Sequence, residues 1–250
     1  MFFWAKRITK VILLCYQIVK QRIPQLAKDD KKYLITGGCS FTNNEFVDFV
    51  QWPEITAAKL GLQLINTARS GDGNQRIYHN VLYEVLKHNP KDIIVIIAFS
   101  DFVRLEFMLE DYDRSGHKKL KEIEKTILED DDNMIECIDE LSKQSLHYMI
   151  SLQSIFKELN IEYYFTQAIY PYPTAFNFPN LVDKIIATNI INTPLIDTSR
   201  FLGWPIMKRL GGFTFNDKVK TYGNYNISET DFHVNAEGQK VMSDIMYNFI

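Results

Sequence analysis

Cysteine is scarce in this chain of 250 residues, and its three cysteines lie far apart. Cys15, Cys39 and Cys137 form no C-x-x-C pair, and their number is odd. Zinc sites and disulfide frameworks use closely and regularly spaced cysteines, so the sequence predicts neither. The scarcity agrees with a soluble protein of a reducing compartment such as the cytoplasm.

A basic excess is also missing. The chain has 28 Lys and Arg against 31 Asp and Glu, which gives a formal net charge of -3. Nonspecific binding of nucleic acid needs positive charge that neutralises phosphates, so we expect no nucleic-acid partner. The motifs G-x-G-x-x-G and G-x-x-x-x-G-K-[ST] are absent as well, which disfavours nucleotide binding through a glycine-rich loop. We expect no metal and no organic cofactor.

The first 32 residues are set apart from the rest as an amphipathic segment and a linker. The longest apolar run there is interrupted by Lys10 and Gln17 and is too short to cross a bilayer, since a spanning helix takes about 20 apolar residues. We favour a helix packed on the domain or on a partner subunit. Aromatic residues 2–4 beside basic ones make a membrane-surface anchor the second alternative, and a signal segment is the third.

Residues 33–250 have the pattern of one α/β domain. Short apolar runs alternate with segments whose apolar residues recur at helical spacing. This alternation predicts a parallel sheet with helices on both faces. We expect strands at 33–36, 62–65, 92–98, 161–165 and 193–196, helices at 53–60, 74–87, 134–159 and 236–250, and an exposed charged excursion at 111–133.

The first loop of this domain carries a serine. Ligands of open parallel sheets bind beyond the carboxyl ends of the strands, and Gly37-Gly38-Cys39-Ser40 follows the first expected strand. Glycines permit a tight turn with free backbone N–H groups, and a serine on that turn is placed as a nucleophile. The alternative is a serine that caps a helix. Cys39 is the rival nucleophile, but neighbours on a turn point in different directions, and the motif favours Ser40.

The segment at 228–238 supplies the partners that a nucleophilic serine requires. A hydroxyl needs a base to take its proton, and the base needs a carboxylate to fix its tautomer. His233 and Asp231 provide both, just before the terminal helix, which we expect Asn235 to cap. The remaining histidines fall on expected helices or on the charged excursion, and we interpret them as surface or packing residues: His79, His88, His117 and His147.

The order of these motifs resembles the SGNH (GDSL-like) hydrolase family. The block at 37–41 is similar to the family's G-D-S-L block, in a G-C-S-F variant. The block at 66–74 has Gly71 at the position of the oxyanion glycine, and the block at 231–238 is similar to the family's last block. The resemblance covers 33–250 and implies a flavodoxin-like three-layer α/β/α sandwich with a mostly parallel sheet.

Two positions depart from the family pattern. Where the family has an oxyanion asparagine after the third strand, this chain has Ser100, whose hydroxyl is a shorter donor. Asn74 and Arg104 are candidate replacements, although Asn74 also suits the N-cap of a helix.

The second departure concerns the acid. The family places an aspartate three residues before the histidine, a position held here by Thr230. Asp231 is our candidate for the acid, and Glu229 is a less favoured substitute.

The resemblance implies hydrolysis of carboxylic esters by Ser40, His233 and Asp231, with Gly71 in the oxyanion hole. The expected substrates are small-molecule esters, including acetyl or acyl groups on carbohydrate or lipid. Two alternatives remain: a catalytically impaired binding module, and an acyltransferase that uses a sugar hydroxyl. Aromatic residues that line either a substrate cleft or, more commonly, the core are Phe41, Trp52, Tyr170, Tyr172 and Trp204.

Overall fold

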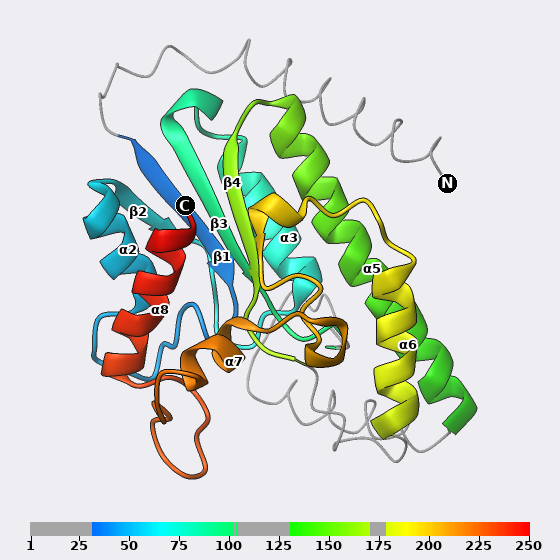
Figure 1. The fold of residues 1–250 in the computed structure, drawn as a ribbon. Coiled ribbons are helices and arrows are strands. Elements are labelled where there is room, and N and C mark those ends of the chain that lie inside the picture. The colour runs from blue at the N-terminus through cyan, green and yellow to red at the C-terminus, as the bar shows by residue number, and fades with distance from the viewer. Residues whose placement is uncertain (1–31, 103, 105–130, 171–178) are drawn as a thin grey trace, which may run out of the picture.

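A computed structural model describes residues 32–102, 104, 131–170 and 179–250. Its centre is a parallel sheet of five strands in the order β2-β1-β3-β4-β5 (Figure 1). The strands are β1 (Tyr33–Gly38), β2 (Gln63–Asn66), β3 (Ile93–Phe99), β4 (Glu162–Gln167) and β5 (Phe201–Leu202). The helices are α2 (Trp52–Leu60), α3 (Asn74–Val85), α5 (Asp131–Glu158), α6 (Pro179–Ile191), α7 (Phe215–Lys220) and α8 (Ala236–Phe249), with short 3-10 turns at Pro90–Asp92, Thr198–Arg200 and Lys208–Leu210.

Alternation of side chains along the strands divides the core into two parts. Ile35 and Val95 belong to the cluster that packs against α3, α5 and α6, whereas Leu34 and Ile96 belong to the cluster against α2, α7 and α8. Figure 1 shows these two helical layers on opposite faces of the sheet. A strand buried on both faces has apolar residues without alternation, as β3 does with its continuous apolar run.

The last strand differs from the expected one. Residues 193–196 form no strand, and β5 instead pairs Phe201 with Phe165 of β4. The reason is a side-chain contact from α5. Gln153 donates to the Leu195 carbonyl at 2.8 Å and accepts from the Asp197 amide at 2.7 Å, so these backbone groups are satisfied without a neighbouring strand.

Other expectations fall partly outside the described residues. The expected charged excursion at 111–133 lies outside the described residues up to residue 130. Helix α5 begins at Asp131, slightly before its expected start at residue 134. The N-terminal segment also lies outside them up to residue 31. Helices α6 and α7 were not expected from the sequence. In the described part of the chain, no helix has the length and apolar character needed to cross a membrane.

Gly37 and Gly38 are required by close approach rather than by a special backbone conformation. Both belong to β1, and neither has a positive φ. A Cβ on Gly37 would overlap the side chain of Val81 on α3, and one on Gly38 would overlap Thr42. The expected tight turn therefore begins after the glycines, and the glycines bring a helix and the loop close to the end of the strand.

We expect Gly37→Ala to lower the free energy of unfolding by about 1–3 kcal/mol, because the added methyl group overpacks the contact between β1 and α3. Denaturant unfolding measures this cost. In a Val81→Ala background the clash is relieved, so the same substitution should cost less there. An equal cost in both backgrounds would contradict this explanation.

Candidate active site

Ser40 lies on a turn directly after β1. The Cys39 carbonyl accepts from the amides of Thr42 and Asn43 at 2.8 and 2.9 Å, which closes the turn. Cys39 itself is completely buried in the core beside α2 and α8, whereas Ser40 is half-buried. The two neighbours therefore face different surroundings. Ser40 caps no helix, since the next helix begins only at Trp52.

A hairpin-like loop before α8 carries His233 and Asp231. Asn226 and Val234 form an antiparallel bridge, and the Ile227 amide donates to the His233 carbonyl at 2.8 Å. The loop ends at Asn235, whose side chain accepts from the Gly238 amide at 3.0 Å and caps α8 as expected. A fixed helix start thus holds the histidine at a defined place.

These two segments, far apart in the sequence, meet at the carboxyl edge of the sheet. His233 Nε2 lies 2.8 Å from Ser40 Oγ, and His233 Nδ1 lies 2.6 Å from Asp231 Oδ1. Both distances are within the reach required of a nucleophile, a base and an orienting acid. The ring of Phe41 lies against the imidazole, with the two centroids 4.7 Å apart. The predicted serine, histidine and aspartate are therefore brought together.

The offset of the acid has a local explanation. Asp231 Oδ1 accepts from the backbone N–H of His233 at 3.0 Å as well as contacting its ring, so the loop folds the carboxylate back onto the imidazole. At the family's usual position, the exposed Thr230 hydroxyl lies 3.3 Å from Ser228 Oγ instead. Glu229 is exposed.

Hydrogen bonds keep the Asp231 carboxylate ionised. The backbone N–H of His233, and then its side chain, lower the pKa of Asp231 below the ordinary value of 3.8. The carboxylate is 41% exposed and the imidazole 31%, so water also reaches the pair. Asp231 is thus negatively charged throughout the neutral pH range.

Gly71 lies on the neighbouring loop in the left-handed region. Its φ of +88° strains any side chain, although a Cβ there would meet no other atom within 4 Å. The loop is tied to the Ser40 turn, because Asn43 donates to the Ala68 carbonyl at 3.0 Å and Ser70 donates to the Asn43 carbonyl at 3.1 Å. In the described part of the chain, the backbone N–H groups of Ser40 and Gly71 make no hydrogen bond.

Asn74 is buried and its amide group is occupied by neighbouring residues. Its Nδ2 donates to Ser145 Oγ at 3.0 Å and to the Ser100 carbonyl at 3.2 Å, and its Oδ1 accepts from the Ser100 amide at 2.8 Å. The N-cap of α3 is Gly73, so of the two roles that the sequence left open for Asn74, that of a helix cap is wrong. The side chain bonds across to the loop after β3 instead.

The other two oxyanion candidates are also turned to neighbouring structure. Ser100 is completely buried, and its Oγ has no hydrogen-bond partner among the described residues. Arg104 Nη1 donates to the Asp72 carbonyl at 3.0 Å and so links the loop after β3 to the Gly71 loop.

The remaining residues that the sequence suggested lie away from this group or outside the described chain. His79 and His147 are exposed, and His88 contacts Glu84 at 2.9 Å. Trp52 is fully buried, and its Nε1 donates to the Phe41 carbonyl at 3.0 Å. His117 and Tyr172 fall outside the described residues. Among the residues that are described, no three His, Cys, Asp or Glu side chains form a metal-binding group.

We expect Asn74→Ala to lower the free energy of unfolding by about 2–3 kcal/mol, because it leaves the buried Ser100 N–H without its acceptor and removes the donor to the buried Ser145 hydroxyl. Denaturant unfolding gives the value. Asn80→Ala on the same helix is the matched control, since half-buried Asn80 makes one long contact of 3.3 Å to Asp72. Equal losses for the two variants would contradict the bridging role of Asn74.

Comparison with known proteins agrees with this architecture. No family model matches the chain, and no curated protein does. The crystal structure of TesA is 11% identical with a TM-score of 0.50, and the match covers 87% of this chain and 97% of that one. The esterase EstA from Pseudoalteromonas sp. is 11% identical with a TM-score of 0.48, covering 87% and 96%. A GDSL-like lipase from Bacteroides thetaiotaomicron is 11% identical with a TM-score of 0.44, covering 93% and 94%.

At these identities the similarity concerns the fold. The TesA match and the five-stranded parallel sheet covered on both faces confirm the expected three-layer α/β/α sandwich.

Proposed function

We propose that the protein hydrolyses carboxylic esters, with Ser40 as nucleophile, His233 as general base and Asp231 as the orienting acid. The observation that carries this proposal is the 2.8 Å contact between Ser40 Oγ and His233 Nε2, on a turn where the serine is half-buried. A serine hydroxyl becomes nucleophilic only when a base takes its proton, and here a base lies in line with a carboxylate.

The reaction proceeds in two halves. In the first, Ser40 Oγ attacks the ester carbonyl while His233 Nε2 takes the hydroxyl proton, and the imidazolium then gives that proton to the departing alkoxide. In the second, His233 takes a proton from water, the hydroxide attacks the acyl-serine, and the proton returns to Ser40 Oγ as the carboxylic acid leaves. No metal or organic cofactor takes part.

The negative charge on the substrate oxygen requires donors. The free N–H groups of Ser40 and Gly71 are suited to it, because backbone donors are fixed in place before the reaction begins. Asp231 Oδ1 accepts from His233 Nδ1, which leaves Nε2 unprotonated toward the serine and stabilises the imidazolium when it forms.

A binding module is the main alternative. The observation that favours it is the buried Ser100 hydroxyl at the position of the family's oxyanion asparagine, since loss of one donor typically costs about 2.7–4 kcal/mol of transition-state stabilisation. An acyltransferase would share the acyl-serine but pass the acyl group to a sugar hydroxyl. Slow ester turnover that rises sharply on addition of a sugar acceptor would favour this activity.

Ser40 should react with a fluorophosphonate probe, and Ser40→Ala should abolish both labelling and ester hydrolysis, with kcat falling by about 10⁴-fold or more. Mass spectrometry locates the label and a 4-nitrophenyl acetate assay measures the rate. Ser154→Ala is the control, since Ser154 is an exposed serine on α5. Persistent turnover in folded Ser40→Ala would disprove the assignment, and failure to label the parent protein would favour the binding module.

Asp231→Asn should lower kcat by roughly 10²- to 10⁴-fold with little change in KM, because an amide in place of the carboxylate favours the wrong imidazole tautomer. Steady-state kinetics measure both constants. Glu229→Gln is the matched control, since it neutralises an exposed acid of the same loop and should leave kcat unchanged. If Glu229→Gln were the more damaging change, the acid would be Glu229 and not Asp231.

A further inference from the structure

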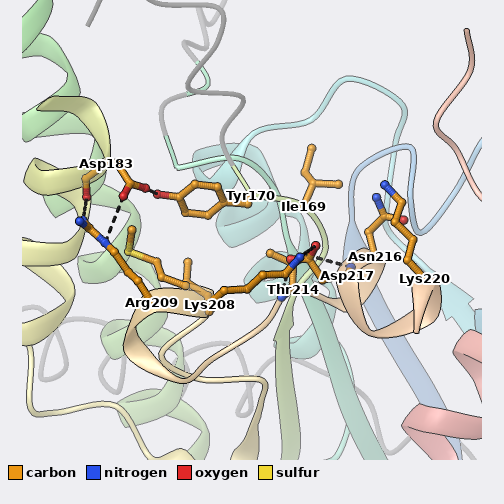
Figure 2. A pocket seen from close by; sticks show the side chains of 11 residues that line it. Ile169, Tyr170, Asp183, Lys208, Arg209, Thr214, Asn216, Asp217 and Lys220 are labelled. Carbon is orange, nitrogen blue, oxygen red and sulfur yellow. Dashed lines mark hydrogen bonds and ion pairs between the residues drawn. The ribbon is translucent and has the colours of Figure 1, made fainter. Parts of the chain in front are cut away.

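A cavity of about 410 Å³ lies at the carboxyl end of β4. It is open to solvent on one side and is lined by the residues that follow β4, by Asp183 of α6, and by residues between Ile206 and Lys220 (Figure 2). Eight of its eleven lining residues have polar or charged side chains and the other three are Ile169, Ile206 and Met207, although apolar atoms make up the larger part of the lining surface. The cavity thus presents a few polar groups on a partly apolar wall, as small-molecule sites commonly do.

Most charges of the cavity are paired inside it. Arg209 Nε lies 3.1 Å from Asp183 Oδ2, and Lys208 Nζ lies 3.0 Å from Asp217 Oδ1. The Tyr170 hydroxyl donates to Asp183 Oδ1 at 2.5 Å. Three cations and two anions line the cavity, so after pairing one positive charge remains, that of Lys220.

Asn216 provides a second unsatisfied group. Its residue is only 7% exposed, yet its side-chain amide has no hydrogen bond to any described residue, although it lines the cavity. Asn216 and Lys220 lie four residues apart on α7, a spacing that places both side chains on the same face of a helix. The polar atoms of this amide are accessible from the cavity, so its N–H can donate a hydrogen bond to a ligand there.

Helix α7 also connects the cavity to the catalytic group. Lys220 Nζ lies 5.9 Å from the centroid of the Phe232 ring, and Phe232 directly precedes His233. On its other side, Phe215 packs edge-on against Trp52, with the two centroids 5.6 Å apart. The cavity therefore adjoins the loop that carries the base.

We infer that this cavity is a substrate subsite that binds a carboxylate of the ester, through the ammonium group of Lys220 and the amide N–H of Asn216. The inference rests on the proposed ester hydrolysis and specifies its substrate class. The substrates are esters that also carry a carboxylate group, separate from the ester group and located beyond the bond that is cleaved. An ammonium ion and an amide donor together satisfy the two oxygens of a carboxylate.

Two aryl acetates of equal shape test this subsite. 4-Acetoxybenzoate carries a carboxylate on its leaving group, and 4-acetoxybenzamide carries a neutral amide at the same place. The measured quantity is the ratio of kcat/KM for the charged ester to kcat/KM for the neutral one. Lys220→Met should lower this ratio about five-fold, the effect of losing one solvent-exposed ion pair. Raising the ionic strength should lower the parent's ratio in the same direction.

Matched variants separate the subsite from general effects on α7. Lys220→Arg keeps the charge and should keep the ratio. Asn216→Asp is nearly isosteric and should lower the ratio, because its carboxylate repels that of the ligand. Lys218→Met is the control on the same helix, since Lys218 lies over the rings of Phe213 and Tyr222 outside the cavity lining, and the ratio should be unchanged.

A binding measurement makes the outcome independent of turnover. Ser40→Ala is titrated with 4-acetoxybenzoate by calorimetry, alone and combined with Lys220→Met, and we expect saturable binding that the second substitution weakens. Turnover of both esters that requires Ser40, with the same ratio in Lys220→Met, would overturn the subsite and leave the hydrolase standing. Saturable binding that depends on Lys220, without turnover in the parent, would support the subsite and refute the hydrolase. Absence of saturable binding would overturn the subsite.

Discussion

The candidate site depends on the packing of α2 against α8. Gln239 Oε1 on α8 accepts from the Trp52 amide at 2.9 Å, and Thr56 Oγ1 donates to Ser243 Oγ at 3.0 Å, both in the buried interior. Buried polar pairs are costly to break or misalign, so they fix one helix relative to the other. Since His233 lies just before α8, this packing places its imidazole over the turn that follows β1. His233 and Ser40 come into contact because α2 and α8 pack against each other on the same face of the sheet.

Glycines that allow close packing also fix the positions of the loops at this site. Gly238 in the first turn of α8 has no room for a Cβ, which would overlap Val234 and Tyr225. Gly37 plays the same part on the other face of the sheet, where α3 lies against β1. The glycines of the first and last motifs therefore have steric functions that fix loops in position. The left-handed conformation needed at Gly71 is a different requirement and involves no contact at all.

Much of this arrangement was predictable from local patterns in the sequence. Short apolar runs predicted four of the strands, and the motif order predicted that Ser40 and His233 lie at one edge of the sheet. The misplaced last strand and the wrong cap at Asn74 have a common cause. Gln153 and Asn74 each bond with their side chains to backbone groups far away in the sequence, and no local pattern records such contacts. The cavity beside α7 was missed for the same reason, because its charges are paired across separate segments.

The loop after β3 is held in place at Ser100 by side chains from two other elements. Its backbone is held by Asn74 and by Gln167, whose side chain donates to the Ser100 carbonyl, so the loop after β3 is fixed although its hydroxyl points into the interior. Charge on a substrate oxygen would then rest on two backbone donors, those of Ser40 and Gly71. With fewer donors at the reacting carbonyl, binding energy from a more distant part of the substrate gains importance, since such contacts help to hold the ester in its reactive geometry. A charged subsite next to the loop of the base is one physical means of supplying that energy.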